Sequence, residues 1–314
     1  MEKLCIRRSI DNGTLIDTLE MTGAAAPLFL VGTRFQAMMV QGIVRHLGLA
    51  EYDLVIYHQC TATSPDEDFV LSALMRNARR VSRIDRCAPT RRQFAALLRA
   101  AGRQNRTVFL AQITHPFVLA LFRLRPGMRL CSFDEGGYNV APDGPFHRPR
   151  PRRVRRPRDA VALALFPGGT IDFVRRRALR HYTAFPPEQN VLSTLAEQIE
   201  LPWASFVQPD EADRARSAGR IMVLPCLKDF TGSAQSREAI LSAARTCDLV
   251  VRHPRDEAVE GLASLRLSSP VEGVICFAAE QRPVQVLHCA STVGLTLAGK
   301  PNIDLIDLCN GLPS

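Results

Sequence analysis

Short apolar runs alternate with longer amphipathic stretches along most of this 314-residue chain. The runs have the length of buried strands, and the stretches between them repeat apolar residues at helical spacing. In the first half of the chain, the predicted strands are 28–31, 54–57, 108–111 and 130–133. The predicted helices are 35–47, 69–79, 91–101 and 116–124. Strands that alternate with helices predict a doubly wound α/β domain with a parallel sheet.

A second α/β region begins with apolar runs at 221–224 and 249–251 that flank an amphipathic helix. This pattern predicts a β-α-β unit, whose parallel strands end at the same edge of the sheet. Asp229 follows the first run and His253 lies at the tip of the second. We therefore expect both side chains to face one crevice, where open α/β sheets bind their ligands.

The residues at this edge carry the groups needed for acid–base chemistry. A carboxylate such as Asp229 can act as a general base, and the imidazole of His253 as a general acid. The neighbouring Arg252 and Arg255 indicate an anionic group nearby. A histidine before Pro254 is also an ordinary turn residue, and from the local sequence alone that alternative stays open.

The rest of the second region continues the alternation. Predicted strands cover 263–267, 284–287 and 302–308. Glu272 lies near the start of a predicted helix, where an acid also suits the helix dipole. Ser291 and Thr292 open a further helix that runs to Leu297, and hydroxyls at a helix start can hold a phosphate or simply cap the helix. We divide the chain into a tail (1–26), an N-terminal domain (27–205) and a C-terminal domain (206–314).

An acidic motif follows the predicted strand 130–133. It reads Asp134-Glu135-Gly136-Gly137, so two carboxylates stand next to glycines that let a ligand approach the backbone closely. A plain turn is an equal alternative, because aspartate and glycine are common turn residues.

Composition narrows the class of protein. The chain is 46% hydrophobic and has no apolar run long enough to span a membrane, and its first residues lack the apolar core of a signal peptide. We therefore expect a globular protein of the cytoplasm. Nine scattered cysteines without a C-x-x-C pair predict reduced thiols, with neither a disulfide framework nor a zinc site.

The positive charge is concentrated in one segment. The formal net charge is +9, and the proline-rich segment Arg148 to Arg158 alone contains seven arginines. Its composition predicts an extended, solvated loop. It would bind an anionic membrane surface or nucleic acid, or remain a plain flexible loop. No aromatic residue interleaves with the arginines, so nucleic acid is the weaker alternative and none is expected as a partner.

Together these motifs resemble the bacterial lipooligosaccharide sialyltransferases of glycosyltransferase family fifty-two. The resemblance rests on the order of weak motifs over most of the chain. They are Phe133 to Asn139, His181 to Phe185, Asp229, His253 to Arg255, Glu272, and Ser291 with Thr292. In the acidic motif this chain has Glu135 where the family has aspartate.

The resemblance implies an α/β fold of two Rossmann-like domains that face each other across a cleft, the GT-B type. It implies CMP-sialic acid as donor and inverting transfer to a saccharide hydroxyl of a lipid-linked acceptor, without cofactor or metal. Asp229 would be the base, with Asp134 as the alternative, and His253 would assist the departing phosphate. Ser291, Thr292 and Glu272 would hold the nucleotide together with Pro254 and Arg255. Asp134 would line the acceptor side, and Glu135 and Gly136 would bind the substrate or nucleotide.

Three alternatives remain open at this point. The donor could be CMP-Kdo, another CMP-nonulosonate or a UDP-sugar. The chain could instead be a non-catalytic protein that binds a membrane or RNA surface. A homodimer could complete the C-terminal domain, and Arg148 to Arg158 could hold the enzyme at the inner membrane face.

Overall fold

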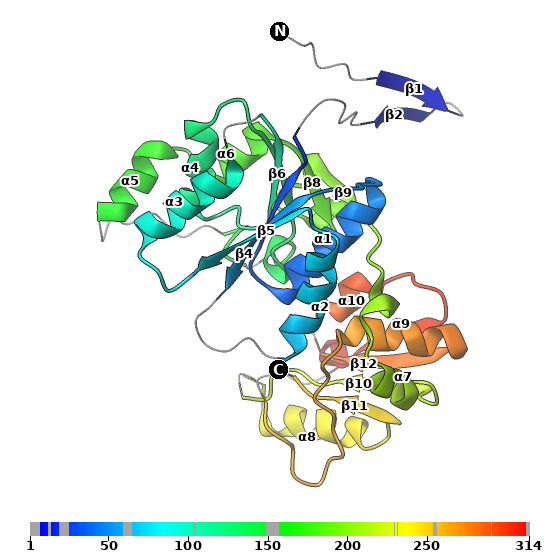
Figure 1. Ribbon diagram of the computed structural model, residues 1–314. Coiled ribbons are helices and arrows are strands. Elements are labelled where there is room, and N and C mark those ends of the chain that lie inside the picture. The colour runs from blue at the N-terminus through cyan, green and yellow to red at the C-terminus, as the bar shows by residue number, and fades with distance from the viewer. Residues whose placement is uncertain are drawn as a thin grey trace.

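The structure is a computed structural model that describes residues 7–11, 14–18, 25–58, 65–102, 105–142, 144–148, 157–228, 230, 232–253, 256–289 and 291–311. Within these residues the chain forms two parallel α/β sheets and a separate antiparallel hairpin (Figure 1). The predicted fold class is confirmed: two Rossmann-like domains face each other across a cleft, in the GT-B arrangement.

The N-terminal domain is built on a parallel sheet with the strand order β5-β4-β3-β6-β7-β8-β9. Its strands in the described residues are β3 (Leu28–Val31), β4 (Asp53–His58), β5 (Arg80–Asp85), β6 (Thr107–Leu110), β7 (Arg129–Phe133), β8 (Ala178–Thr183) and β9 (Ala196–Gln198). The chain starts at the centre and winds outward in both directions, which is the Rossmann order. The order reverses between β3 and β6, so the ligand crevice of this sheet lies beyond the carboxyl ends of these strands.

Helices cover both faces of this sheet, because its central strands are apolar on both sides. In β3, Leu28 and Leu30 pack into one core cluster while Phe29 and Val31 pack into the other. The first cluster lies under α3 (Thr90–Ala101), α4 (Pro116–Leu124), α5 (Pro157–Leu165) and α6 (Thr170–Arg177). The second lies under α1 (Arg34–His46) and α2 (Pro65–Arg76).

The C-terminal domain has a smaller parallel sheet with the order β11-β10-β12-β13. Its strands in the described residues are β10 (Arg220–Val223), β11 (Leu249–Val251), β12 (Val284–His288) and β13 (Ile303–Asp307). One face packs on α8 (Ala234–Ala244), and the other packs on α7 (Pro209–Ala215), α9 (Val271–Gln281) and α10 (Val293–Thr296). The order reverses between β10 and β12, which puts the ligand crevice at the loops after these strands.

The 3-10 helices η2 (Pro187–Gln189) and η3 (Ser193–Leu195) connect β8 to β9, and η4 (Trp203–Phe206) follows β9 in the linker between the two sheets. The predicted domain boundary after Ser205 lies within η4 and stays a prediction. η4 packs on α9 so closely that a Cβ at Gly273 would lie 2.6 Å from the Trp203 carbonyl oxygen. The Lys300 ammonium also pairs with Glu200 at 2.9 Å, so the linker is fixed to the C-terminal domain at both points.

Two predictions of strands were wrong. The structure has β5, where we expected a loop between two helices. Only Ile84 of β5 is fully buried, because β5 is an edge strand, so its sequence lacks a strong apolar run. Residues 263–267 do not form the predicted strand; Leu265 makes a single bridge to Val251.

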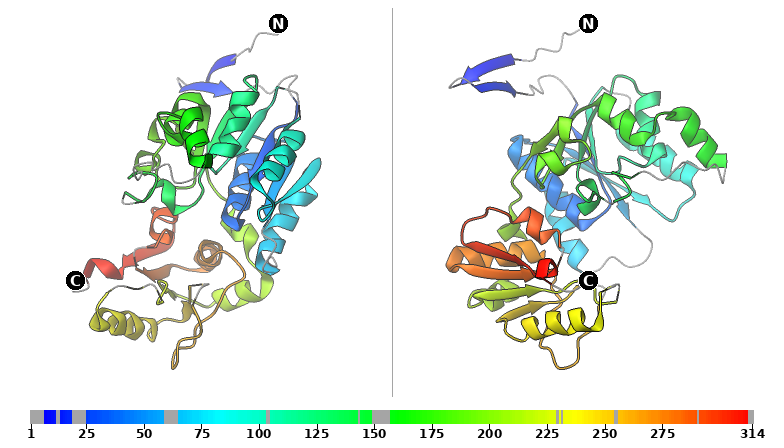
Figure 2. Two further views of the ribbon diagram at one scale, coloured as in Figure 1. Left: turned by 90° about the vertical axis from the view of Figure 1, so that its left-hand side faces the viewer. Right: turned by 180° about the vertical axis from the view of Figure 1, so that it is seen from behind.

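Two further differences concern the N-terminal tail and the cysteines. The predicted tail contains an antiparallel hairpin of β1 (Arg7–Asp11) and β2 (Thr14–Thr18), which stands apart from both sheets in every view (Figures 1 and 2). Cys289 and Cys309 form a disulfide, where we expected only reduced thiols. Their separation of 20 residues hid the pairing, which arises because β12 and β13 lie side by side and end together.

Candidate active site

A cavity of about 610 Å³ lies between the two domains, and we call it the cleft cavity. Its N-terminal wall comes from the first turns of α1, just beyond β3. Its C-terminal wall comes from the ends of β10, β11 and β12 and the start of α9. Both switch points of the strand order therefore open toward one space, which is where open α/β sheets bind their ligands.

Four residues singled out in the sequence line this cavity together. His253 follows β11, Glu272 lies in the first turn of α9, and Ser291 and Thr292 lie between β12 and α10. Their gathering follows from parallel strands that end on one edge, while the expected pairing of His253 with Asp229 stays a prediction. Asp229, Pro254 and Arg255 lie outside the described residues.

Two arginines add positive charge to the cleft cavity. Arg252 lines it, and its buried Nε atom has no hydrogen-bond partner among the described residues. Arg34, at the start of α1, lines it from the other domain. Sequence reasoning missed Arg34, although its position directly after the first strand of a Rossmann sheet was a usable signal. Two guanidinium groups facing one cavity favour an anionic ligand.

The carboxyl group of Glu272 is affected by both burial and charge. Burial at the domain contact raises its pKa, and the nearby Arg34 guanidinium partly opposes that shift. A carboxyl group with a raised pKa retains a proton to higher pH than an exposed one. It can therefore donate a hydrogen bond to a ligand as well as accept one.

The helix that follows Ser291 and Thr292 is shorter than predicted. The predicted helix to Leu297 is the single turn α10, so a macrodipole contributes little here. Ser291 Oγ accepts a hydrogen bond from the Val293 amide at 3.3 Å, and Thr292 is exposed at the cavity. Any phosphate at this loop would be bound by hydroxyl and amide groups rather than by a helix dipole.

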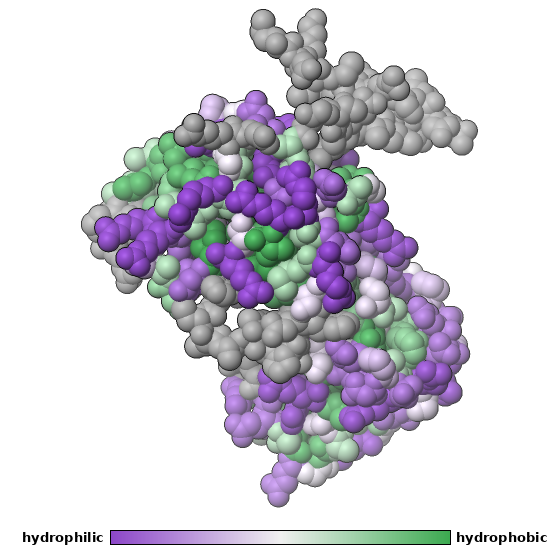
Figure 3. Space-filling model, viewed as in Figure 1, coloured by the Kyte–Doolittle hydropathy of each residue, from purple (hydrophilic) through white to green (hydrophobic). Residues whose placement is uncertain are grey.

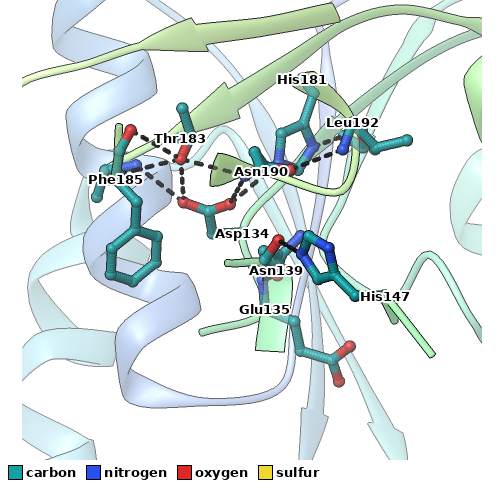
Figure 4. Close-up of polar contacts among 11 residues, drawn as sticks. Asp134, Glu135, Asn139, His147, His181, Thr183, Phe185, Asn190 and Leu192 are labelled. Atoms are coloured by element: carbon teal, nitrogen blue, oxygen red, sulfur yellow. Dashed lines mark hydrogen bonds and ion pairs between the residues drawn. The ribbon is translucent and has the colours of Figure 1, made fainter. Parts of the chain in front are cut away.

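Asp134, by contrast, is completely buried at the end of β7 and accepts hydrogen bonds from several donors (Figure 4). These donors are His181 Nε2 at 3.0 Å, Thr183 Oγ1 at 2.8 Å, the Ala184 amide at 2.9 Å and Asn190 Nδ2 at 2.9 Å. The His181 ring is also hydrogen-bonded to Ser132 Oγ at 2.9 Å. Such a network holds β7, β8 and the η2 loop in one arrangement.

The alternative of Asp134 as the base is therefore corrected. A general base must come within hydrogen-bond reach of the acceptor hydroxyl, and Asp134 has an exposed fraction of 0%. Its carboxylate oxygens are already bonded to protein donors. Asp134 positions the backbone of the acidic motif, and the sequence could not distinguish it from its neighbour.

Glu135 is the carboxylate of the motif that faces open space. Its side chain points away from the Asp134 network, and its amide donates to Asn139 Oδ1 at 2.8 Å (Figure 4). It lines a second cavity of about 1140 Å³ in the N-terminal domain, together with Tyr138, whose side chain is 59% exposed. Burial raises the pKa of Glu135, and Arg86 partly opposes this. A carboxylate of raised pKa is a stronger base once ionised.

The acidic motif reaches the C-terminal domain at Gly137. A Cβ at Gly137 would lie 2.7 Å from Thr292 Cγ2, so the acidic motif packs directly on the loop that lines the cleft cavity. Figure 2 shows α10 reaching from the smaller sheet toward the N-terminal domain. Glu135 lines the second cavity and Thr292 lines the cleft cavity, and the acidic motif touches the Thr292 loop at Gly137.

Comparisons with known proteins find only distant structural similarity. No protein-family model matches the chain, and no curated protein matches its sequence. Among solved structures, LpCGTa in complex with UDP is similar with a TM-score of 0.43 and 11% identity, over 90% of this chain and 84% of that chain. A UDP-N-acetylglucosamine 2-epimerase is similar with a TM-score of 0.44 and 14% identity, over 90% and 84% of the two chains. Similarity this low does not assign an activity.

The described residues contain no helix that is both long and apolar enough to cross a membrane.

Proposed function

We propose that this protein is an inverting glycosyltransferase that moves sialic acid from CMP-sialic acid to a saccharide hydroxyl of a lipooligosaccharide or surface glycan. The observation that carries the proposal is the cleft cavity, where His253, Glu272, Ser291 and Thr292 line one space between the domains. The motif resemblance found in the sequence names the donor.

The charge of the cleft cavity supports an anionic donor. A CMP-sugar brings a phosphate and a sugar carboxylate, and Arg34 and Arg252 both line the cavity. In this proposal, hydroxyl groups of Ser291 and Thr292 bind the phosphate. Glu272, with its raised pKa, hydrogen-bonds to the nucleotide as donor or acceptor.

In the chemical step, the acceptor oxygen forms a bond to the anomeric carbon while the bond from that carbon to the phosphate oxygen breaks. The acceptor proton passes to a carboxylate, and CMP leaves with the bonding electrons. His253 protonates or hydrogen-bonds the departing phosphate. Asp229 remains the base predicted from sequence, and Glu135 replaces Asp134 as the alternative because its carboxylate lines a cavity.

The second cavity is our proposed acceptor site. Its volume of about 1140 Å³ suits several sugar rings. The exposed ring of Tyr138 offers an apolar face against which a sugar ring can stack. The contact between Gly137 and Thr292 would bring an acceptor there close to a donor in the cleft cavity.

A donor screen tests the proposal. The purified full chain is incubated with CMP-sialic acid, CMP-Kdo, UDP-glucose and UDP-N-acetylglucosamine, each with a mixture of soluble oligosaccharides, and free nucleotide is measured. We expect CMP release from CMP-sialic acid, and a loss of about 100-fold or more in His253→Ala. Exposed His46, which pairs with Glu197, gives the matched control His46→Ala.

Other outcomes would change the proposal. Release of UDP alone would replace the donor and retain a glycosyltransferase. If no nucleotide is released and calorimetry shows no binding of CMP or UDP, both the proposed donor and the glycosyltransferase activity are contradicted. The non-catalytic alternative is then favoured.

A further inference from the structure

Three side chains of types that can bind a metal ion lie together beside the cleft cavity. Cys226 lies in the loop after β10, and His253 and Asp256 lie after β11. The Cys226 sulfur, a His253 ring nitrogen and an Asp256 oxygen all lie within 4.8 Å of one another. Neither the glycosyltransferase reaction nor the sequence motifs require this combination.

Asp256 is held in place by backbone groups. Its side chain is only 7% exposed, and its Oδ2 accepts a short hydrogen bond of 2.7 Å from the Leu227 amide. Among the described residues, its Oδ1 accepts longer hydrogen bonds, of 3.3 Å from the Lys228 amide and 3.5 Å from the Cys226 thiol. One oxygen therefore anchors the carboxylate, and the other is the weakly bonded one beside the thiol.

The Asp256 carboxyl group is buried beside the Cys226 thiol and the His253 imidazole. Sulfur, nitrogen and oxygen ligands of these kinds are those that Zn²⁺ prefers.

We propose that Cys226, His253 and Asp256 bind one Zn²⁺ ion. Cys226 and His253 both line the cleft cavity, so the fourth position of a tetrahedral ion would open into it, as in zinc sites that keep a position for water or a ligand. On binding, the thiol loses its proton to solvent, and the thiolate and carboxylate together balance the two positive charges.

The ligand atoms must approach slightly to bind the ion. Zinc bonds of about 2.0–2.3 Å in tetrahedral geometry put neighbouring ligand atoms roughly 3.3–3.8 Å apart. The required movement is about 1 Å, from separations of up to 4.8 Å. Asp256 is the fixed ligand, and the half-buried Cys226 and His253 supply the movement by side-chain rotation.

Zinc binding at this site would affect catalysis, an inference that rests on the proposed function. The imidazole of His253 cannot bind Zn²⁺ and at the same time serve the departing phosphate. Zinc at this site therefore inhibits transfer. Binding itself is measured without turnover, so failure of the zinc site and failure of the proposed reaction are distinguishable.

The test measures zinc binding by the full chain, purified without reductant so that the Cys289–Cys309 disulfide remains closed. Zn²⁺ is titrated in competition with a chromogenic chelator, and Co²⁺ is used as a spectroscopic substitute. We expect one ion per chain and, with Co²⁺, a thiolate-to-metal charge-transfer band in the near ultraviolet. Cys226→Ser should remove that band and weaken zinc binding by more than about ten-fold, as should Asp256→Asn.

Controls separate the site from general effects. Cys247→Ser removes a thiol outside the proposed site, which donates to the Ala243 carbonyl oxygen. This variant should bind zinc with the same affinity as the unaltered chain. Circular dichroism checks whether Asp256→Asn still folds. If it does not, Cys226→Ser remains a valid test, because it leaves the hydrogen bonds between Asp256 and the backbone in place. Equal zinc affinity in Cys226→Ser, or cobalt binding without the thiolate band, would overturn the proposal.

Discussion

Gly137 and Thr292 touch across the domain boundary: a Cβ on the glycine would lie 2.7 Å from Cγ2 of the threonine. The distance is shorter than real Cβ contacts, so a side chain here requires the Thr292 side chain or its loop to shift.

Gly137→Ala should therefore destabilise the protein by about 1–3 kcal/mol through overpacking. The measurement is urea-induced unfolding. Thr292→Ser removes the clashing methyl group, so adding it to Gly137→Ala should restore most of the lost stability. A double variant as unstable as Gly137→Ala alone would show that the contact with Cγ2 is not the cause.

Asp134→Asn should cost about 3–5 kcal/mol of unfolding free energy, because an amide NH₂ would replace an oxygen that accepts from buried donors. Asp213→Asn is the control; this carboxylate is 74% exposed and pairs with Arg216, so its loss should cost less than about 1 kcal/mol. Equal effects in urea-induced unfolding would contradict the structural role of Asp134.

Glu135 gives a prediction for pH dependence. A base must be ionised to accept a proton, so if Glu135 is the base the transfer rate should fall as pH drops through its raised pKa and level off above it. Glu135→Gln should lower the rate about 100-fold or more and remove this acidic limb. Retention of the limb in Glu135→Gln would leave Asp229 as the base, with Asp229→Asn as the deciding variant.

The Cys289–Cys309 disulfide closes a loop that contains Ser291 and Thr292. Reduction should lower the unfolding free energy by about 2–4 kcal/mol, since the unfolded chain gains freedom. The double variant Cys289→Ser with Cys309→Ser should show this loss without reductant and no further loss with it. If reductant leaves the unaltered protein's unfolding curve unchanged, the bridge is absent in solution.

Arg148 to Arg158 remain the predicted membrane-docking segment; residues 149–156 lie outside the described part of the chain. Replacing their seven arginines with serine should reduce binding to anionic vesicles and activity on a lipid-embedded acceptor, while sparing a soluble acceptor. Binding should also weaken as salt rises.

The protein offers a matched control for this experiment, because hydrophilic side chains cover much of the face in Figure 3. Exposed arginines of β5 and α3, namely Arg80, Arg83, Arg91 and Arg92, can be replaced in the same way. An equal loss of vesicle binding in both variants would mean that general charge, rather than the segment, attracts the membrane. An equal loss on the soluble acceptor would put the segment in the active site.

Much of the fold could be read from the sequence, because buried strands need apolar runs and covering helices need an apolar face. The runs at 28–31, 108–111 and 249–251 became β3, β6 and β11 within a residue. Parallel strands share an edge, so the meeting of His253 with Glu272, Ser291 and Thr292 was also foreseeable. The edge strand β5 was missed because it is mostly exposed and therefore has no continuous run of apolar residues.

Only the tertiary structure decided how neighbouring residues divide their roles. Asp134 and Glu135 are adjacent acids in the sequence, yet β8 and the η2 loop enclose the first and leave the second at a cavity. The same holds for Cys226, His253 and Asp256, which come from two loops, and for Cys289 and Cys309, which end adjacent strands. Sequence patterns report which side of an element is buried; they do not report which loops meet, because that depends on strand order and domain packing.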